Sequence, residues 1–150
     1  MKQNHKKIKI YSHALCNSVD TFDKFKSIKL SLNELTDLSK KDLTINTFLK
    51  SKSIDLNQKT NIFIKAFKDI FDKNLLDILL VMIENDDMNL LVEINKSFVI
   101  LAKDKLNIAY VEVTSSSDMD SNAKNELSER LSTITKKKID IEMHPTVYNM

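Results

Sequence analysis

Apolar residues recur every three or four positions along most of the first hundred residues, which is the spacing of one face of an α-helix. Polar breaks divide this pattern into six segments, and they fall near residues 17–20, 39–42, 51–55, 73–74 and 85–87. Six helices joined by short connections are typical of a helical bundle. The sequence therefore predicts a six-helix bundle over residues 1–106.

Candidate capping residues stand at several of the predicted helix starts. Asp20 is a candidate N-cap of the second helix, and residues 39–42 have the S-x-x-D form of a capping box before the third. Lys73 and Asn74 interrupt the apolar pattern, so the fifth helix is expected to begin after them, over residues 75–83. That segment is apolar on nearly every side, which predicts burial on most of its surface.

After Asn107 the hydrophobic period changes from that of a helix to that of a strand. Residues 108–113 and 139–143 alternate as strands do, and a helical pattern separates them, with Ala123, Leu127, Leu131 and Ile134 on its expected inner face. The sequence therefore predicts a small α/β part, strand–helix–strand, over residues 107–150. The fold class as a whole is mainly α.

The absence of glycine excludes two kinds of nucleotide site. The chain has 150 residues and not one glycine, where about 7% is usual. The P-loop and the dinucleotide fingerprint need glycine at fixed places, so neither can be present and no cofactor is predicted. The net charge is only +2, and all but one of the 23 basic residues are lysine, which argues against a nucleic-acid partner.

His13 and Cys16 are neighbours at i, i+3, the spacing that a metal half-site or a Cys–His nucleophile pair would use. Zinc needs three or four ligands, and the two other histidines stand near the ends of the chain. Nothing in the sequence indicates an oxyanion hole. A structural role is favoured, so no metal site and no catalytic residue is predicted here.

Acidic residues gather in two places that could carry acid–base chemistry or bind calcium: Glu84, Asp86 and Asp87, and then Asp118 and Asp120. Both groups fall at predicted helix junctions, where Asp and Asn commonly cap helices and tolerate the left-handed conformation. Helix capping is the favoured interpretation. The longest continuous apolar stretch is also far shorter than a membrane span, so no direct membrane insertion is expected.

The apolar surface of the predicted bundle allows two interpretations. Tyr11 and Leu15 on the first helix and the apolar segment 75–83 could bury one another as ordinary core. Alternatively, surplus apolar surface between them forms a groove that accepts an amphipathic helix from a partner protein. The residues alone leave both interpretations open.

Several short motifs occur in a characteristic order: Tyr11-Ser12-His13-Ala14-Leu15, LLDILLVMIEN at 75–85, residues 90–98, Val111-Glu112-Val113-Thr114-Ser115, residues 127–143 and His144-Pro145. Their order resembles that of the delta subunit of F-type ATP synthases, the counterpart of the mitochondrial oligomycin-sensitivity-conferring protein. Two features depart from the family pattern. Asp86 and Asp87 stand where a basic residue is usual, and the chain closes on VYNM in place of Leu-Ile-Gly-Gly. The C-terminal domain is therefore expected to lack the family's last strand and helix.

The resemblance implies a non-catalytic stator subunit that resists rotational torque during proton-driven ATP synthesis. The bundle would sit on the catalytic head, and the C-terminal part would contact the peripheral-stalk b subunits. The first and fifth helices would form a groove for the N-terminal helix of an alpha subunit, lined by Tyr11, Leu15, Leu75, Ile78, Leu79 and Met82. The protein would be peripheral on the cytoplasmic face of the bacterial inner membrane. The alternative is a helical protein–protein adaptor unrelated to ATP synthase.

Overall fold

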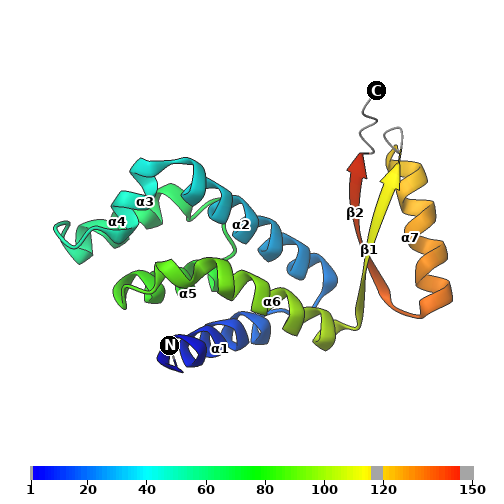
Figure 1. Ribbon diagram of the computed structural model, residues 1–150, viewed down its shortest axis with the longest axis horizontal. Coiled ribbons are helices and arrows are strands. Elements are labelled where there is room, and N and C mark those ends of the chain that lie inside the picture. The colour runs from blue at the N-terminus through cyan, green and yellow to red at the C-terminus, as the bar shows by residue number, and fades with distance from the viewer. Residues whose placement is uncertain (1, 116–119, 146–150) are drawn as a thin grey trace. The chain divides into compact units, whose positions relative to one another are not determined.

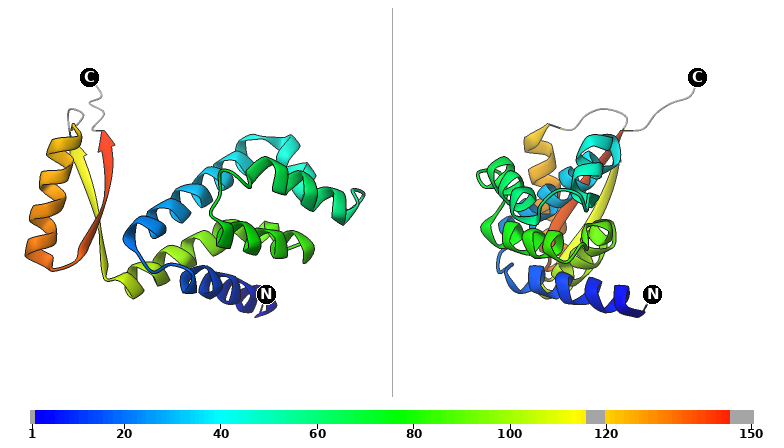
Figure 2. Two further views of the ribbon diagram at one scale, coloured as in Figure 1. Left: turned by 180° about the vertical axis from the view of Figure 1, so that it is seen from behind. Right: turned by 90° about the vertical axis from the view of Figure 1, so that its left-hand side faces the viewer.

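The computed structural model describes residues 2–115 and 120–145, and it confirms the predicted mainly α fold (Figures 1 and 2). The chain divides into two compact units between Ala102 and Lys103. The helices that precede the first strand are α1 (Lys2–Asn17), α2 (Phe22–Lys41), α3 (Leu43–Lys50), α4 (Leu56–Phe67), α5 (Lys73–Glu84) and α6 (Leu91–Leu106). A single turn of 3₁₀-helix, η1 (Met88–Leu90), leads into α6.

Two helix starts differ from the sequence prediction by one or two residues. Thr21, and not Asp20, is the N-cap of α2, and its side chain accepts a hydrogen bond from the third backbone N–H beyond it. Lys73 and Asn74 do not interrupt a helix, because both belong to the first turn of α5. Asp72 caps that helix by accepting a hydrogen bond from the backbone N–H of Asn74, at 2.9 Å.

The predicted capping box before α3 is wrong, because a box with Ser39 as the N-cap would begin the helix at residue 40, whereas α3 begins at Leu43. Asp42 is the N-cap, and its carboxylate accepts hydrogen bonds from two backbone N–H groups of the first turn. Ser39 instead belongs to α2, and its hydroxyl donates to the carbonyl oxygen of Leu35 at 2.9 Å. Ser39 cannot cap α3, because it lies inside α2 and the N-cap position belongs to Asp42.

Three non-glycine residues among those described adopt positive φ, each after the end of a helix. Asp86 (φ 58°) follows α5, Asn107 (φ 55°) follows α6 and Lys136 (φ 56°) follows the last helix. Helices commonly end on a left-handed residue, which is usually glycine. Because this chain has no glycine, Asp, Asn and Lys take the conformation. Asn85, the C-cap residue of α5, has negative φ.

Aromatic and aliphatic side chains from several helices form the core of the first unit. The rings of Phe25 on α2 and Phe98 on α6 lie 5.9 Å apart, and both are fully buried. The other side chains that are no more than 1% exposed include Leu15, Val19, Ile28, Leu32, Leu35, Leu75, Leu79, Met82 and Ile94. α1 lies along α5, so the first and fifth helices are neighbours, as the resemblance implied (Figure 1).

The second unit consists of β1 (Ile108–Ser115), α7 (Ser121–Thr135) and β2 (Lys138–Pro145). The two strands pair in parallel, in a register that opposes Ile108 to Lys138 and Ser115 to Pro145. Parallel neighbours need a crossover connection, and α7 supplies it. The sequence placed Ile134 on the inner face of this helix, which is wrong, because its side chain is 78% exposed.

Candidate partner-binding surface

A buried carboxylate ties α1 to the connection between α5 and α6. The Asp87 side chain is only 6% exposed, and its Oδ2 accepts a 2.7 Å hydrogen bond from the hydroxyl of Tyr11. Its Oδ1 accepts from the ammonium of Lys7 at 2.9 Å. The side-chain amide of Asn85 donates to the same tyrosine oxygen at 3.2 Å. These four side chains, Lys7, Tyr11, Asn85 and Asp87, are called the Asp87 network below.

The network corrects the capping interpretation of the acidic residues. Asp87 stands at the N-cap position of η1, yet its side chain makes no capping hydrogen bond. Its carboxylate instead binds groups on a helix 76 and 80 positions earlier in the chain. At the other predicted cluster, Asp120 does cap α7, accepting from the backbone N–H of Ala123 at 2.7 Å. Asp118 lies outside the described residues.

Burial and the Asp87 carboxylate raise the pKa of the Tyr11 phenol. Burial raises the pKa of this hydroxyl above its ordinary value of 10.0, because the phenolate would lose its hydration. The Asp87 carboxylate raises that pKa further by accepting the hydroxyl proton and repelling a negative charge, while the Asn85 amide opposes the rise. Tyr11 is therefore a hydrogen-bond donor at neutral pH, and the arrangement joins two segments of the bundle.

The six side chains predicted to line a groove lie mainly in the core. Leu15, Leu75, Leu79 and Met82 are at most 1% exposed, and Tyr11 is 8% exposed. Ile78 is half-buried. These residues therefore form the packed contact between α1, α5 and their neighbours, and any partner that binds here must contact the side chains beside them.

Two exposed apolar side chains on the same helices were missed by the sequence analysis. Ile10 on α1 is 57% exposed and Val81 on α5 is 45% exposed. A shallow depression runs along α1 beside Ile10 and the exposed Ala14, with Lys6 and Lys9 also on its wall. The signal in the sequence was an apolar residue next to the main apolar stripe of each helix, which widens the apolar face.

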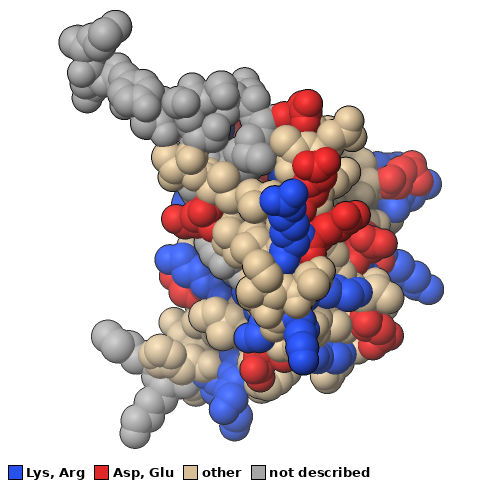
Figure 3. Space-filling view, turned by 90° about the vertical axis from the view of Figure 1, so that its right-hand side faces the viewer, with Lys and Arg blue, Asp and Glu red and all other residues tan. Residues whose placement is uncertain are grey.

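The other candidate residues do not assemble into a chemical site. Cys16 is buried and His13 is exposed, so the two side chains face different environments on α1. Among residues 2–115 and 120–145, no three His, Cys, Asp or Glu side chains are arranged to hold a metal ion. No helix in this part of the chain is long and apolar enough to cross a bilayer. On the face drawn in Figure 3, basic and acidic side chains are interspersed.

Comparison with known proteins identifies the family. The family model for the ATP synthase delta (OSCP) subunit matches residues 8–147. The chain belongs to the ATP synthase delta family. ATP synthase subunit delta of Clostridium botulinum (strain Okra / Type B1) is 30% identical over 132 residues, which cover 88% of this chain and 74% of the relative. The same subunit of strain Kyoto / Type A2 is 29% identical over the same shares of both chains.

A solved structure shares the fold of this delta-family chain. A chain in the cryo-EM structure of the Toxoplasma gondii mitochondrial ATP synthase hexamer superposes with a TM-score of 0.60, covering 92% of this chain and 76% of that one. At 13% identity this likeness shows the fold alone. The family resemblance drawn from the order of the sequence motifs is thus confirmed, and the chain is an ATP synthase stator subunit by family.

Proposed function

We propose that this delta-family chain holds the catalytic head of a bacterial F-type ATP synthase to its peripheral stalk. The role is mechanical and non-catalytic, because rotation of the central shaft exerts torque on the head and a stator must resist it. The helical unit would bind the N-terminal helix of an alpha subunit, and the second unit would bind the b subunits. The complex would hold the chain on the cytoplasmic face of the inner membrane. Family membership supports this proposal.

The observation that supports the alpha-subunit contact is one exposed apolar side chain on each of the neighbouring helices α1 and α5, which are together called the apolar rim below. Ile10 and Val81 are about half exposed, beside a packed layer that includes Tyr11 and Met82. An amphipathic helix laid along this rim would bury those side chains, and each aliphatic side chain contributes about 1.5–3 kcal/mol when fully buried. Lys6 and Lys9 flank the rim and would pair with carboxylates on the polar face of such a helix.

The test measures binding of a peptide with the sequence of the alpha-subunit N-terminus. Substitution of the buried Leu79 or Met82 by a charged residue would unfold the bundle, so the informative variants are Ile10→Asp and Val81→Asp. Each should weaken binding by about tenfold or more, which corresponds to about 1.4 kcal/mol or more. Ile62→Asp is the matched control, because Ile62 lies on α4 and is 52% exposed.

Equal weakening by Ile62→Asp would mean that added charge, and not the rim, decides binding, and would contradict the proposed contact. Unchanged affinity in both rim variants would contradict it as well. The stalk contact is tested separately by Ile134→Asp, since this α7 side chain is 78% exposed and lies in the second unit. That variant should lose retention by immobilised b subunits while it still binds the alpha-subunit peptide.

A further inference from the structure

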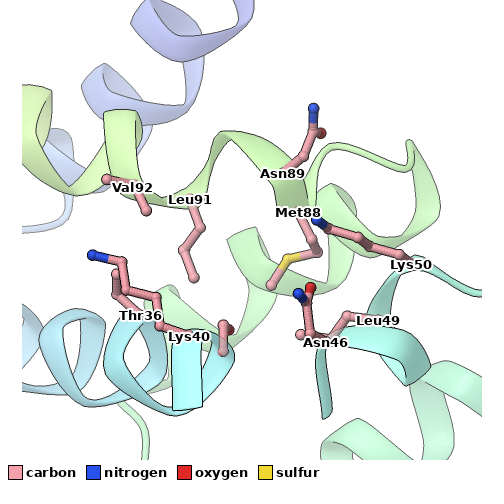
Figure 4. A pocket seen from close by; sticks show the side chains of 10 residues that line it. Thr36, Lys40, Asn46, Leu49, Lys50, Met88, Asn89, Leu91 and Val92 are labelled. Atoms are coloured by element: carbon pink, nitrogen blue, oxygen red, sulfur yellow. The ribbon is translucent and has the colours of Figure 1, made fainter. Parts of the chain in front are cut away.

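A second hollow lies within the first unit, on elements other than α1 and α5. It has a volume of about 250 Å³ and opens between the C-terminal half of α2, α3, and the segment from η1 into α6 (Figure 4). Its apolar wall is made by Leu49, Met88 and Leu91, which are 5%, 8% and 4% exposed. The close-up shows the side chains of Met88 and Leu91 extending into the hollow. The proposed stator function makes no use of this pocket.

The polar side chains around the hollow are Lys40, Asn46, Lys50 and Asn89. None of these four forms a side-chain hydrogen bond or an ion pair with any residue that the structure describes. In Figure 4 the Lys50 side chain extends toward Met88 and Asn89, while Lys40 lies on the opposite side of the hollow. In the same view the Asn46 amide lies beside Met88, whereas the Lys40 ammonium and the Asn89 amide extend away from Met88.

The charge around the hollow is unbalanced. No carboxylate is among its lining residues, although the chain carries 21 acidic residues against 23 basic ones. The two lysines and the adjoining hydroxyls of Thr36 and Ser39 all come from α2 and α3. Lysine binds phosphate and carboxylate as a point charge, and an amide adds a directed donor. An anion would balance the positive charge of these side chains.

We propose that the pocket binds a small organic anion. Lys50, with the amide of Asn46, would hold a phosphate or carboxylate head. An aliphatic body would contact Met88, Leu91 and Leu49, because the hollow is larger than an inorganic anion needs. Ligand pockets commonly measure about 300–1,000 Å³, so a volume at or below that lower end fits a body of a few carbon atoms.

The experiment titrates the full-length protein with hexyl phosphate and follows backbone amide chemical shifts. Hexanoate is a second probe, inorganic phosphate tests the head alone, and hexanol tests the body alone. Hexyl phosphate or hexanoate should shift the amides of Met88, Asn89 and Leu91. Lys50→Gln should weaken that binding by about fivefold to tenfold, the effect of one charge-assisted hydrogen bond at an exposed site.

Lys41→Gln is the control, because Lys41 is exposed and adjacent to Lys40 but does not line the hollow. Its affinity for hexyl phosphate should equal that of the unsubstituted chain. Equal weakening by Lys41→Gln would show attraction to overall charge, and equal binding of hexanol would show that the head is irrelevant. If inorganic phosphate bound as tightly as hexyl phosphate, the apolar wall would contribute nothing to the affinity. Any of these results overturns the proposal, and none of them bears on binding of the alpha-subunit peptide.

Discussion

The Asp87 network predicts a large energetic coupling between two residues that lie 76 positions apart. The hydrogen bond from Tyr11 to Asp87 is 2.7 Å long, and both groups are more than nine-tenths buried. A hydrogen bond to a charged group contributes about 1.5–3 kcal/mol to stability. Lys7 is 44% exposed at its side chain, so its ion pair with the same carboxylate contributes only about 0.2–1 kcal/mol.

Two double-mutant cycles, Tyr11→Phe with Asp87→Ala and Lys7→Met with Asp87→Ala, measure these terms separately. Urea unfolding of the full chain, followed by far-ultraviolet circular dichroism, gives the free energies of unfolding. The tyrosine cycle should return a coupling of about 1.5–3 kcal/mol, and the lysine cycle about 0.2–1 kcal/mol. Added salt should reduce the second coupling much more than the first, because screening acts mainly on exposed charges.

A tyrosine coupling below about 0.5 kcal/mol would refute the reasoning, since a buried charge-assisted hydrogen bond cannot be that weak without water taking its place. A lysine coupling larger than the tyrosine coupling would refute the ranking by burial. The first result would mean that the hydrogen bond from Tyr11 does not hold α1 on the bundle, and the second would mean that the ion pair from Lys7 holds it more strongly than that hydrogen bond.

Three further outcomes follow from the same structure. The pKa of Tyr11 is raised in the folded chain, so the unfolded chain loses the phenol proton at lower pH than the folded chain does. The free energy of unfolding should therefore fall as pH rises above about 10. The urea midpoint measures this fall, which should be smaller in Tyr11→Phe. Lys136→Gly should stabilise the second unit by about 0.5–1 kcal/mol, because the Lys136 backbone has the left-handed conformation that glycine adopts without strain. Lys137→Gly is the control and should not stabilise it. Amide hydrogen exchange in α7 measures both effects. Lys59 is buried, and its ammonium donates hydrogen bonds to the carbonyl oxygens of Leu49 and Ser51. Lys59→Ala should therefore lower the free energy of unfolding in urea by about 1–3 kcal/mol. Lys65→Ala is the control and should not lower it, because Lys65 is exposed.

Hydrophobic periodicity predicted the helices and strands because burial of one face decides where each element forms. The hydrophobic period did not show which residue caps each helix. Asp20 and Thr21 are adjacent and both are good capping residues, so only the path of the chain between α1 and α2 decides between them. Ser39 failed as a cap because α2 continues through it, and propensity alone does not show where a helix gives way to the next.

The sequence indicated that α1 and α5 are neighbours, but it did not indicate which of their apolar side chains are exposed. The apolar stripe of α1 and the apolar sequence of α5 indicated that these helices matter, but the same pattern marks a core residue and a rim residue. Met82 and Val81 are both apolar and adjacent, yet one is fully buried and the other is 45% exposed. Which of them faces a partner depends on how α5 is rotated against its neighbours. That rotation is a tertiary property.

The Asp87 network had no local signal, since its members come from the first helix and from a junction some 80 residues later. Apolar contacts hold α1 on the bundle without fixing its rotation, because burial of apolar area is not directional. The hydrogen bond from Tyr11 is directional, and it orients that residue toward the α5–α6 connection. Successive residues of a helix project about 100° apart, so a fixed direction for Tyr11 also fixes the direction of Ile10, which is 57% exposed. The Asp87 network would thus orient the α1 part of the apolar rim without itself contacting the proposed partner helix.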